Sequence, residues 1–272
     1  TEIVGNILAF LSIINFMISG VPLDNSAVFF TPRIVGGVDA PEGFASHMVA
    51  LVFGEWTRSL MCGASIISNN HVLTAAHCID ALVDVRGKLI PTFRGSYGSN
   101  RWDSTENLVK FSHYKNHENW NPSSIKNDIG MLFLEDELSR SDKFAVIPLN
   151  YDWVDGGDHS YVTGWGRLSV WDGIPSKLQL LYIETIDGQV CIDMFKGLWA
   201  PLIDKRVELC TLHPKGKGYG MCNGDSGSAL VSTETGTQTG IVSWGIPCAF
   251  GAPDVFVRVS AYKDWIQNIL EQ

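Results

Sequence analysis

The chain has 272 residues, and 45% of them are hydrophobic, so it can bury a sizeable core as one large domain or as two fused halves. This composition argues against a disordered chain. The formal net charge of −9 argues against nucleic acid as a partner, because binding to nucleic acid needs a basic face.

The first segment differs in kind from the rest of the chain. Residues 3–20 carry no charged side chain and end in the small residues Ser19 and Gly20, as a secretory signal peptide does before its cleavage site. The run is also just long enough to span a membrane, but no basic residue follows immediately to stop its transfer. We therefore predict a signal peptide over residues 1–20 and no membrane association once it is removed.

A short segment follows, with the sequence "VPLDNSAVFFTPR" over residues 21–33. It ends in the basic residue Arg33, directly before "IVGG", which is typical of a proteolytic processing site. We predict that residues 21–33 form a propeptide and that residues 34–272 form the mature domain.

The mature domain consists mainly of short strand-like runs separated by Gly, Asn, Asp and Pro. The runs have the length and the branched or aromatic content of strands, and they are "MVALVF", "CGASIIS", "GMLFL", "YVTGWG", "TGIVSWG" and "DVFVRVS". An all-β fold is therefore predicted. The end of the chain is the exception, because Tyr262, Trp265, Ile266, Ile269 and Leu270 recur at helical intervals after Ser260, a candidate N-cap.

Six cysteines, all after Arg33, predict three disulfides in a secreted chain, although 15 pairings are open on sequence alone. No metal site is predicted. The sequence has no C-x-x-C spacing, and its seven histidines form no zinc-finger pattern. His113 and His117 would share the face of a helix, but their surroundings have poor helical periodicity, so we interpret them as surface loop residues.

Three separate motifs supply the groups needed for nucleophilic catalysis by serine. A serine hydroxyl attacks only when an imidazole takes its proton, and a carboxylate must orient that imidazole and stabilise its charged form. "VLTAAHC" offers His77, "NDIGML" offers Asp128 and "GDSGS" offers Ser226. Each motif alone is weak evidence, and only a tertiary fold can bring the three residues together.

With "RIVGG", "TGWG" and "SWG", these motifs occur in the order typical of the chymotrypsin-like (trypsin-fold) serine peptidases, which the chain resembles from Ile34 onward. It looks closest to arthropod chymotrypsin-like and brachyurin-type enzymes. The resemblance implies two six-stranded antiparallel Greek-key barrels with a C-terminal helix and a site in the cleft between them. The chain departs from the family at Ser228, Ala229 and Gly130, where Gly, Pro and Ala are usual; glycine in a strand packs nothing and can cost stability.

The resemblance also implies the roles of individual residues. His77 would act as general base and then acid, Asp128 would orient it, and Ser226 would be the nucleophile. The backbone N–H groups of Gly224 and Ser226 would form the oxyanion hole. Asp225 would pair with the α-amino group of Ile34, freed by a trypsin-like protease that cuts after Arg33, so the chain would be a zymogen.

The same resemblance selects a disulfide pairing of Cys62 with Cys78, Cys191 with Cys210 and Cys222 with Cys248. Such bonds persist in oxidising compartments, so we expect an extracellular, secreted protein. We further expect a monomer that needs no cofactor and has polypeptide substrates, with protein inhibitors as further partners.

The specificity pocket implied by the resemblance is walled by residues 220–223, 243–245 and 253–255, with the substrate-binding residues Gly220, Met221, Asn223, Ser243, Trp244, Gly245 and Asp254. A trypsin-like enzyme would carry Asp where Gly220 stands, so cleavage after Phe, Tyr and Leu is predicted. Asp254 complicates this prediction, because it would either bind Arg or Lys through an ion pair or be satisfied by backbone donors.

Two classes of function follow, an active endopeptidase and a non-catalytic binding protein on the same fold. The complete set of catalytic groups favours the enzyme. Residues 21–33 hold no cysteine and leave no room for an accessory module, which favours an independent digestive enzyme over a tethered member of a regulated cascade.

Overall fold

The computed structural model describes residues 34–272 except 140 and 199. The predicted signal peptide, the propeptide and Arg33 lie outside these residues. Each of two sheets contains seven strands. The first sheet comprises β2 (Met48–Phe53), β3 (Ser59–Ile66), β4 (His71–Thr74), β5 (Arg94–Tyr97), β6 (Leu108–Val109), β7 (Phe111–Asn116) and β8 (Gly130–Leu134). The second comprises β1 (Val38–Asp39), β9 (His159–Gly164), β10 (Gln179–Ile186), β11 (Glu208–Leu212), β12 (Ala229–Ser232), β13 (Gln238–Gly245) and β14 (Asp254–Arg258).

Both sheets are barrel-like, and all their pairings are antiparallel. The second sheet runs β10-β11-β14-β13-β12-β9 and closes because β9 also pairs with β10, while β1 adds two residues at β10. In the first sheet β6 and β7 are two parts of one strand, interrupted at Lys110, that pairs with β5 on one side and β8 on the other. The prediction of two six-stranded barrels is therefore confirmed, and the additional strands are β1 and this interruption.

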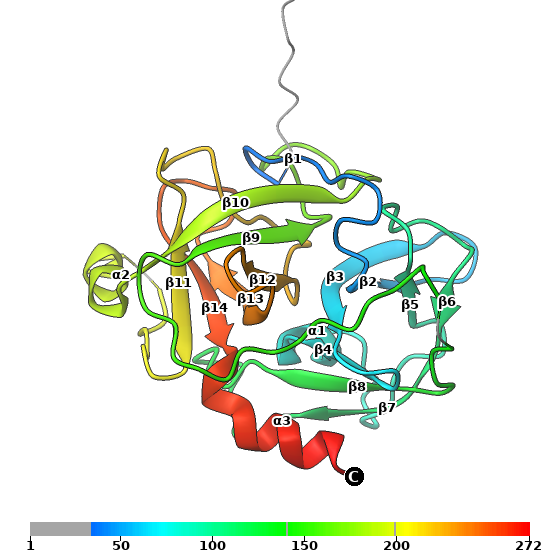
Figure 1. Cartoon of the computed structure of the whole chain (residues 1–272). Coiled ribbons are helices and arrows are strands. Elements are labelled where there is room, and N and C mark those ends of the chain that lie inside the picture. The colour runs from blue at the N-terminus through cyan, green and yellow to red at the C-terminus, as the bar shows by residue number, and fades with distance from the viewer. Residues whose placement is uncertain (1–33, 140, 199) are drawn as a thin grey trace, which may run out of the picture. The chain divides into compact units, whose positions relative to one another are not determined.

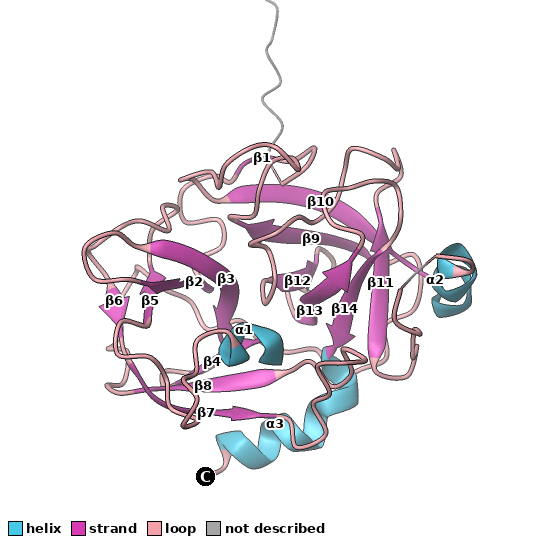
Figure 2. Ribbon diagram, turned by 180° about the vertical axis from the view of Figure 1, so that it is seen from behind, coloured by secondary structure: helices cyan, strands magenta, loops and turns pink. Residues whose placement is uncertain are grey.

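Figures 1 and 2 show the two barrels side by side, with the helix α3 (Lys263–Leu270) leading away from β14 and lying beside β7 and β8. The interior consists mainly of apolar side chains from the strands, of which β12 and β14 are buried along their whole length. Leu51, Ile66 and Leu132 fill the first barrel, and Val162 and Phe256 fill the second; all five are fully buried. This packing holds the loops between the barrels in fixed positions.

The helices differ from the prediction in detail. The C-terminal helix exists, but it begins at Lys263 after a 3₁₀ turn, η1 (Val259–Tyr262), so Ser260 lies inside that turn and is not the N-cap. Two short helices, α1 (Ala76–Asp80) and α2 (Gly188–Phe195), were not predicted. At α2 the carboxylate of Asp187 caps the helix by accepting from two backbone N–H groups.

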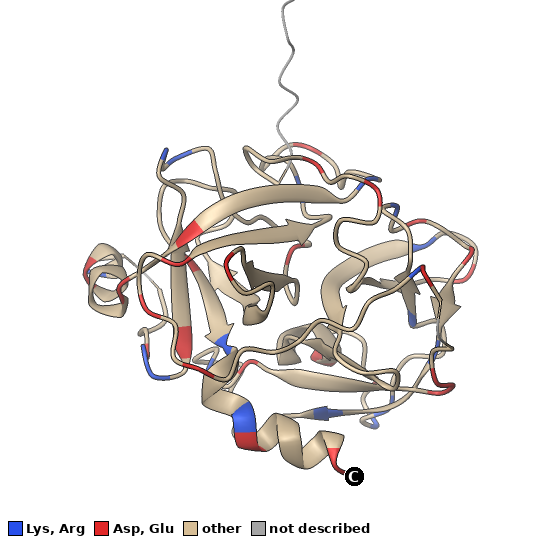
Figure 3. Ribbon diagram, in the orientation of Figure 1, with Lys and Arg blue, Asp and Glu red and all other residues tan. Residues whose placement is uncertain are grey.

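The charged residues are distributed as expected for a chain with a formal net charge of −9. Lys and Arg are scattered along the ribbon and interspersed with Asp and Glu (Figure 3). His113 lies exposed in β7 rather than in a loop, and its ring stacks on Phe133 with the centroids 4.0 Å apart. Of the helices that the structure describes, none is both long and apolar enough to span a membrane.

Candidate active site

His77 and Asp128 are held together at the open side of the first barrel. His77 lies in α1, directly after β4, and Asp128 lies two residues before β8. Since β4 and β8 are neighbours, with Thr74 paired to Gly130, the sheet brings these two residues together. His77 Nδ1 donates to Asp128 Oδ2 at 2.7 Å, and the backbone N–H of His77 donates to Asp128 Oδ1 at 2.9 Å.

The carboxylate of Asp128 is buried and accepts hydrogen bonds from several donors. Asp128 is 1% exposed, and Ser243 Oγ donates to its Oδ2 at 2.6 Å, so the carboxylate takes three donors in all. Burial alone would lower the pKa of His77, but the hydrogen bond and charge of Asp128, with the charge of Asp80, raise it. The imidazole is thereby fixed with its Nδ1–H toward Asp128, which leaves Nε2 to accept a proton.

Ser226 lies in the loop that leads into β12. Its carbonyl accepts from the N–H of Gly63 at 2.8 Å, which ties this loop to β3 of the first barrel. Between the described residues Ser226 and His77 there is no side-chain hydrogen bond, and catalytic hydrogen bonds commonly tighten only when substrate binds. Ser226 is half-buried and lines the pocket described below.

Two glycines give this loop its shape. Gly224 has φ +104°, and a Cβ there would lie 3.1 Å from the Cα of Gly166. Gly227 has φ +80°, and a Cβ there would lie 2.2 Å from the carbonyl oxygen of Gly63. An L side chain at either position would strain the backbone and displace the neighbouring chain, so the tight turn around Ser226 requires glycine.

Asp225, the residue before Ser226, lies beside Gly166, which follows β9 of the second barrel. It is fully buried, and its two oxygens accept from the N–H groups of Gly166 at 2.7 Å and Cys222 at 3.0 Å. Burial raises its pKa to about 6, because these two donors only partly offset the lost hydration. The side chain of Ile34 is also fully buried, in the apolar group that includes Val162 and Met221.

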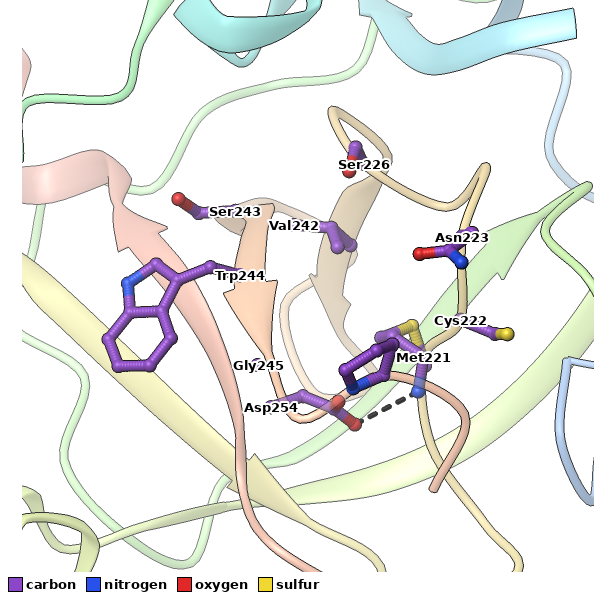
Figure 4. Close-up of a pocket in the computed structure, with 10 residues that line it drawn as sticks. Met221, Cys222, Asn223, Ser226, Val242, Ser243, Trp244, Gly245 and Asp254 are labelled. Carbon is purple, nitrogen blue, oxygen red and sulfur yellow. Dashed lines mark hydrogen bonds between the residues drawn. The ribbon is translucent and has the colours of Figure 1, made fainter. Parts of the chain in front are cut away.

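A pocket of about 160 Å³ opens beside Ser226 (Figure 4). It is lined by Met221, Cys222, Asn223, Ser226, Val242, Ser243, Trp244, Gly245, Pro247 and Asp254. The lining includes most residues of the predicted walls but not Gly220, Pro253 or Val255, and the prediction missed Val242 and Pro247. Gly220 lies behind the pocket, where it leaves room for the carboxylate of Asp254.

Asp254 is the charged group of this pocket. It is 7% exposed, and its Oδ2 accepts from the N–H of Met221 at 3.0 Å (Figure 4). Burial raises its pKa to about 8, and the nearby charge of Asp225 adds to this effect. One backbone donor thus satisfies one of its two oxygens, and no cationic side chain of the described residues pairs with it.

The disulfides hold the loops of the site. Cys62 is bonded to Cys78, next to His77, and Cys222 is bonded to Cys248, which joins the loop of Ser226 to the far wall of the pocket. The third bond joins Cys191 in α2 to Cys210 in β11. All three pairs are those that the resemblance implied.

The site does not fit a metal ion in the part of the chain that the structure describes. The one group of three candidate ligands there is Cys62, His77 and Cys78. Both cysteines are used in a disulfide, which leaves the imidazole as a single ligand.

Comparisons with known proteins agree with this geometry. A family model described as Trypsin matches residues 34–266. Chymotrypsin-2 of Vespa crabro is 37% identical over 236 residues, which are 86% of this chain and 99% of the relative. Trypsin alpha-4 of Lucilia cuprina is 31% identical over 235 residues, 86% of each chain. The vitellin-degrading protease of Bombyx mori is 31% identical over 239 residues, 87% of this chain and 85% of the relative.

Proposed function

Because the chain belongs to the trypsin family and is a serine endopeptidase, we propose that it is a secreted, digestive enzyme, made as a zymogen and active on polypeptides through an acyl-enzyme. The observation that carries the mechanism is the hydrogen bond of His77 to a buried Asp128, beside a pocket that Ser226 lines. A digestive role draws on the insect relatives, which are named as chymotrypsin and trypsins.

In the proposed mechanism Ser226 attacks the carbonyl carbon of the scissile bond. His77 Nε2 takes the hydroxyl proton as the C–O bond forms, and it then gives that proton to the leaving amine as the C–N bond breaks. Asp128 stabilises the imidazolium throughout. Water then attacks the acyl-enzyme by the same route, which releases the acid and restores Ser226.

The developing oxyanion needs donors, and we assign them to the N–H groups of Gly224 and Ser226. The positive φ of Gly224 supports this assignment, because it allows the tight turn that can bring the N–H groups on either side of Asp225 to one face of the loop. Removing one such donor from a peptidase typically costs a factor of about 10²–10³ in kcat.

Activation follows from Asp225. The carboxylate is fully buried with two neutral donors, so a cation beside it would relieve the cost of burying its charge. We propose that a trypsin-like protease cuts after Arg33 and that the new α-ammonium group of Ile34 supplies this cation. The buried side chain of Ile34 supports the proposal, since it already lies inside the second barrel.

For specificity we propose cleavage after Phe, Tyr and Leu, with Arg and Lys as secondary residues. Met221 and Val242 give the pocket an apolar wall, and Gly220 provides no charge. Asp254 offers one oxygen to the pocket, and burial favours its neutral form near neutral pH. An apolar guest therefore meets no buried charge there, whereas a cationic guest must first ionise the acid.

Active-site titration with an organophosphonate, after cleavage at Arg33, tests the proposal. We expect one equivalent of label on Ser226 and none in Ser226→Ala. No label in the cleaved wild-type protein would instead favour a non-catalytic binding protein. Ratios of kcat/KM for substrates that differ only in the residue before the cut then test specificity, and a tenfold preference for Arg or Lys over Phe and Leu, about 1.4 kcal/mol, would overturn it.

A further inference from the structure

One edge of β13 is free beside the pocket. Its ladder with β12 ends at Ile241, whereas its ladder with β14 continues to Gly245. Among the residues that the structure describes, the segment 243–245 therefore has no strand partner on the side of β12, where an extended peptide can add as a further strand. Under the proposed function, on which this inference rests, that peptide is the part of the substrate before the scissile bond.

Trp244 is the large side chain of this free edge. Trp244 is half-buried and is one of the residues that line the pocket, but its indole points away from Met221 and Asp254 (Figure 4). Three groups contact it: Nε1 donates to Glu208 Oε1 at 2.9 Å, Lys126 Nζ lies 5.4 Å from the ring centroid, and the ring of Phe195 in α2 packs at 5.3 Å between centroids. The indole is thus fixed by a charge pair on one side and by an apolar ring on another.

Glu208 is the centre of this arrangement. It is 5% exposed at the start of β11, and Lys126 Nζ lies 2.7 Å from its Oε1. Its Oε2 accepts from the N–H of Asp204 at 2.7 Å. The carboxylate is therefore fully hydrogen-bonded, which is the condition under which a buried ion pair is retained.

The ion pair joins the two barrels. Lys126 lies in the loop before β8, two residues before Asp128, and it is only 20% exposed. Glu208 belongs to the second barrel. Asp204 is the other acid near Lys126, but it forms an ion pair with Arg206 at 2.7 Å. Lys126 therefore pairs with Glu208.

We propose that Lys126 and Glu208 are positioning residues, which hold Trp244 in the orientation that receives substrate residues preceding the one in the specificity pocket. Lys126 comes from the loop before β8 of the first barrel and Glu208 from β11 of the second, so the pair ties Trp244 to both barrels beside the pocket. It thereby sets the affinity for extended substrates and leaves the chemistry at Ser226 unchanged.

The test compares two substrates with the same residue before the cut, one a single blocked amino-acid amide and the other a tetrapeptide amide. For Lys126→Met we expect KM for the tetrapeptide to rise about three- to tenfold, as when one cation–π contact and one charge-assisted hydrogen bond are lost. Both kcat values and the KM of the short substrate should change less than about twofold, within the scatter of near-neutral surface substitutions. Lys126→Arg should restore tetrapeptide binding.

The matched control is Lys115→Met, which breaks a surface ion pair with Glu118 at 3.3 Å. It should change kcat and KM for neither substrate. If Lys126→Met does not fold, Glu208→Gln removes the charge of the ion pair and keeps the length of the side chain, and it should show the same dependence on substrate length. Equal losses on both substrates, or none on either, would overturn the proposal. Organophosphonate titration of every variant separates this result from a failure of the proposed function, because an inactive site would take no label in the wild type either.

Discussion

The carboxylate of Asp254 occupies the space beside Gly220. A Cβ built on Gly220 would lie 2.6 Å from Asp254 Oδ2, closer than real side chains approach. Gly220 is the position at which the resemblance places the acid of a trypsin-like pocket. In this protein the acid comes from β14 on the opposite wall, and glycine at 220 is what lets it enter.

The first prediction concerns the pH dependence of specificity. Because the pKa of Asp254 is raised to about 8, its carboxyl is neutral at pH 6 and ionised at pH 9. The ratio of kcat/KM for an Arg substrate to that for a Phe substrate should therefore rise over this range. Taking the ratio cancels the titrations of His77 and Asp225, which act on both substrates.

Asp254→Asn removes the titrating group and keeps its shape, so its ratio should stay flat from pH 6 to pH 9. Parallel profiles for the wild type and Asp254→Asn would mean that Asp254 only fixes the backbone of Met221.

The second prediction concerns activation. In Asp225→Asn the buried carboxylate is lost, so the ammonium group of Ile34 gains no partner and the turn of Gly224 is not held. After cleavage at Arg33, verified by mass spectrometry, kcat/KM on peptides should fall by about 10²–10³, the effect of losing an oxyanion donor. Asp152→Asn, an exposed acid, serves as the control and should activate fully. Full activity of cleaved Asp225→Asn would contradict the proposed ion pair.

The sequence predicted those parts of the molecule that single motifs specify. His77, Asp128 and Ser226 each stand in a short motif that can be found by eye in the sequence. The turn around Ser226 needs glycine at positions 224 and 227, because another side chain there would strain the backbone. The strands followed from the length and the branched or aromatic content of their runs, and the fold followed from the resemblance that the order of the motifs carries. These are local requirements, so they are visible in a local stretch of sequence.

What sequence did not predict depends on neighbours far apart in the chain. Lys126 and Glu208 are 82 positions apart and look like ordinary surface charges until β11 brings them together. Gly130 appeared to leave empty space, but a Cβ there would lie 2.6 Å from Ile79 Cδ1 and 2.7 Å from Asn116 Oδ1. The strand that contains β6 and β7 is interrupted at Lys110, because its first part pairs with β5 and its second part with β8. The composition of a run does not show which strands it will pair with.

The third prediction concerns the acid limb of the activity profile. Activity should fall as pH drops through the pKa of His77, because the protonated ring cannot accept the serine proton. The charge of Asp80 helps to raise that pKa. Asp80→Asn should therefore move the midpoint of the limb to lower pH and leave the maximal kcat in place, since the new side chain can still accept from Trp120 Nε1. Asp84→Asn, an exposed acid elsewhere, is the control. An unchanged midpoint in Asp80→Asn would show that its charge does not reach His77.

The fourth prediction concerns the contact between Gly63 and Ser228. Ser228 Oγ is buried with no hydrogen-bond partner among the described residues, and it lies 2.2 Å from where a Cβ on Gly63 would stand. Gly63→Ala should therefore destabilise the protein by about 1–3 kcal/mol, as overpacking does. Ser228→Gly should recover most of that loss when combined with Gly63→Ala. Urea unfolding of the single and double variants measures the coupling, and simple additivity would disprove the steric account.

The last prediction concerns stability at acid pH. His47 is 5% exposed, its Nε2 has no hydrogen-bond partner in the part of the chain that the structure describes, and burial lowers its pKa to about 4. In the unfolded chain its pKa is about 6.5, so between pH 6.5 and pH 4 the unfolded state binds more protons than the folded state. The stabilisation is complete above pH 6.5 and is lost as pH falls toward 4, by about 3 kcal/mol in the free energy of unfolding.

His47→Gln removes this titration. The difference in unfolding free energy between wild type and His47→Gln should therefore shrink or reverse from pH 7 to pH 4, and comparing the two proteins cancels the opposite trends of Asp225 and Asp254, whose raised pKa values favour the folded state as pH falls. His113→Gln, at an exposed position of β7, should follow the wild type across the range. Parallel stability curves for wild type and His47→Gln would show that His47 takes up its proton without loss of the fold.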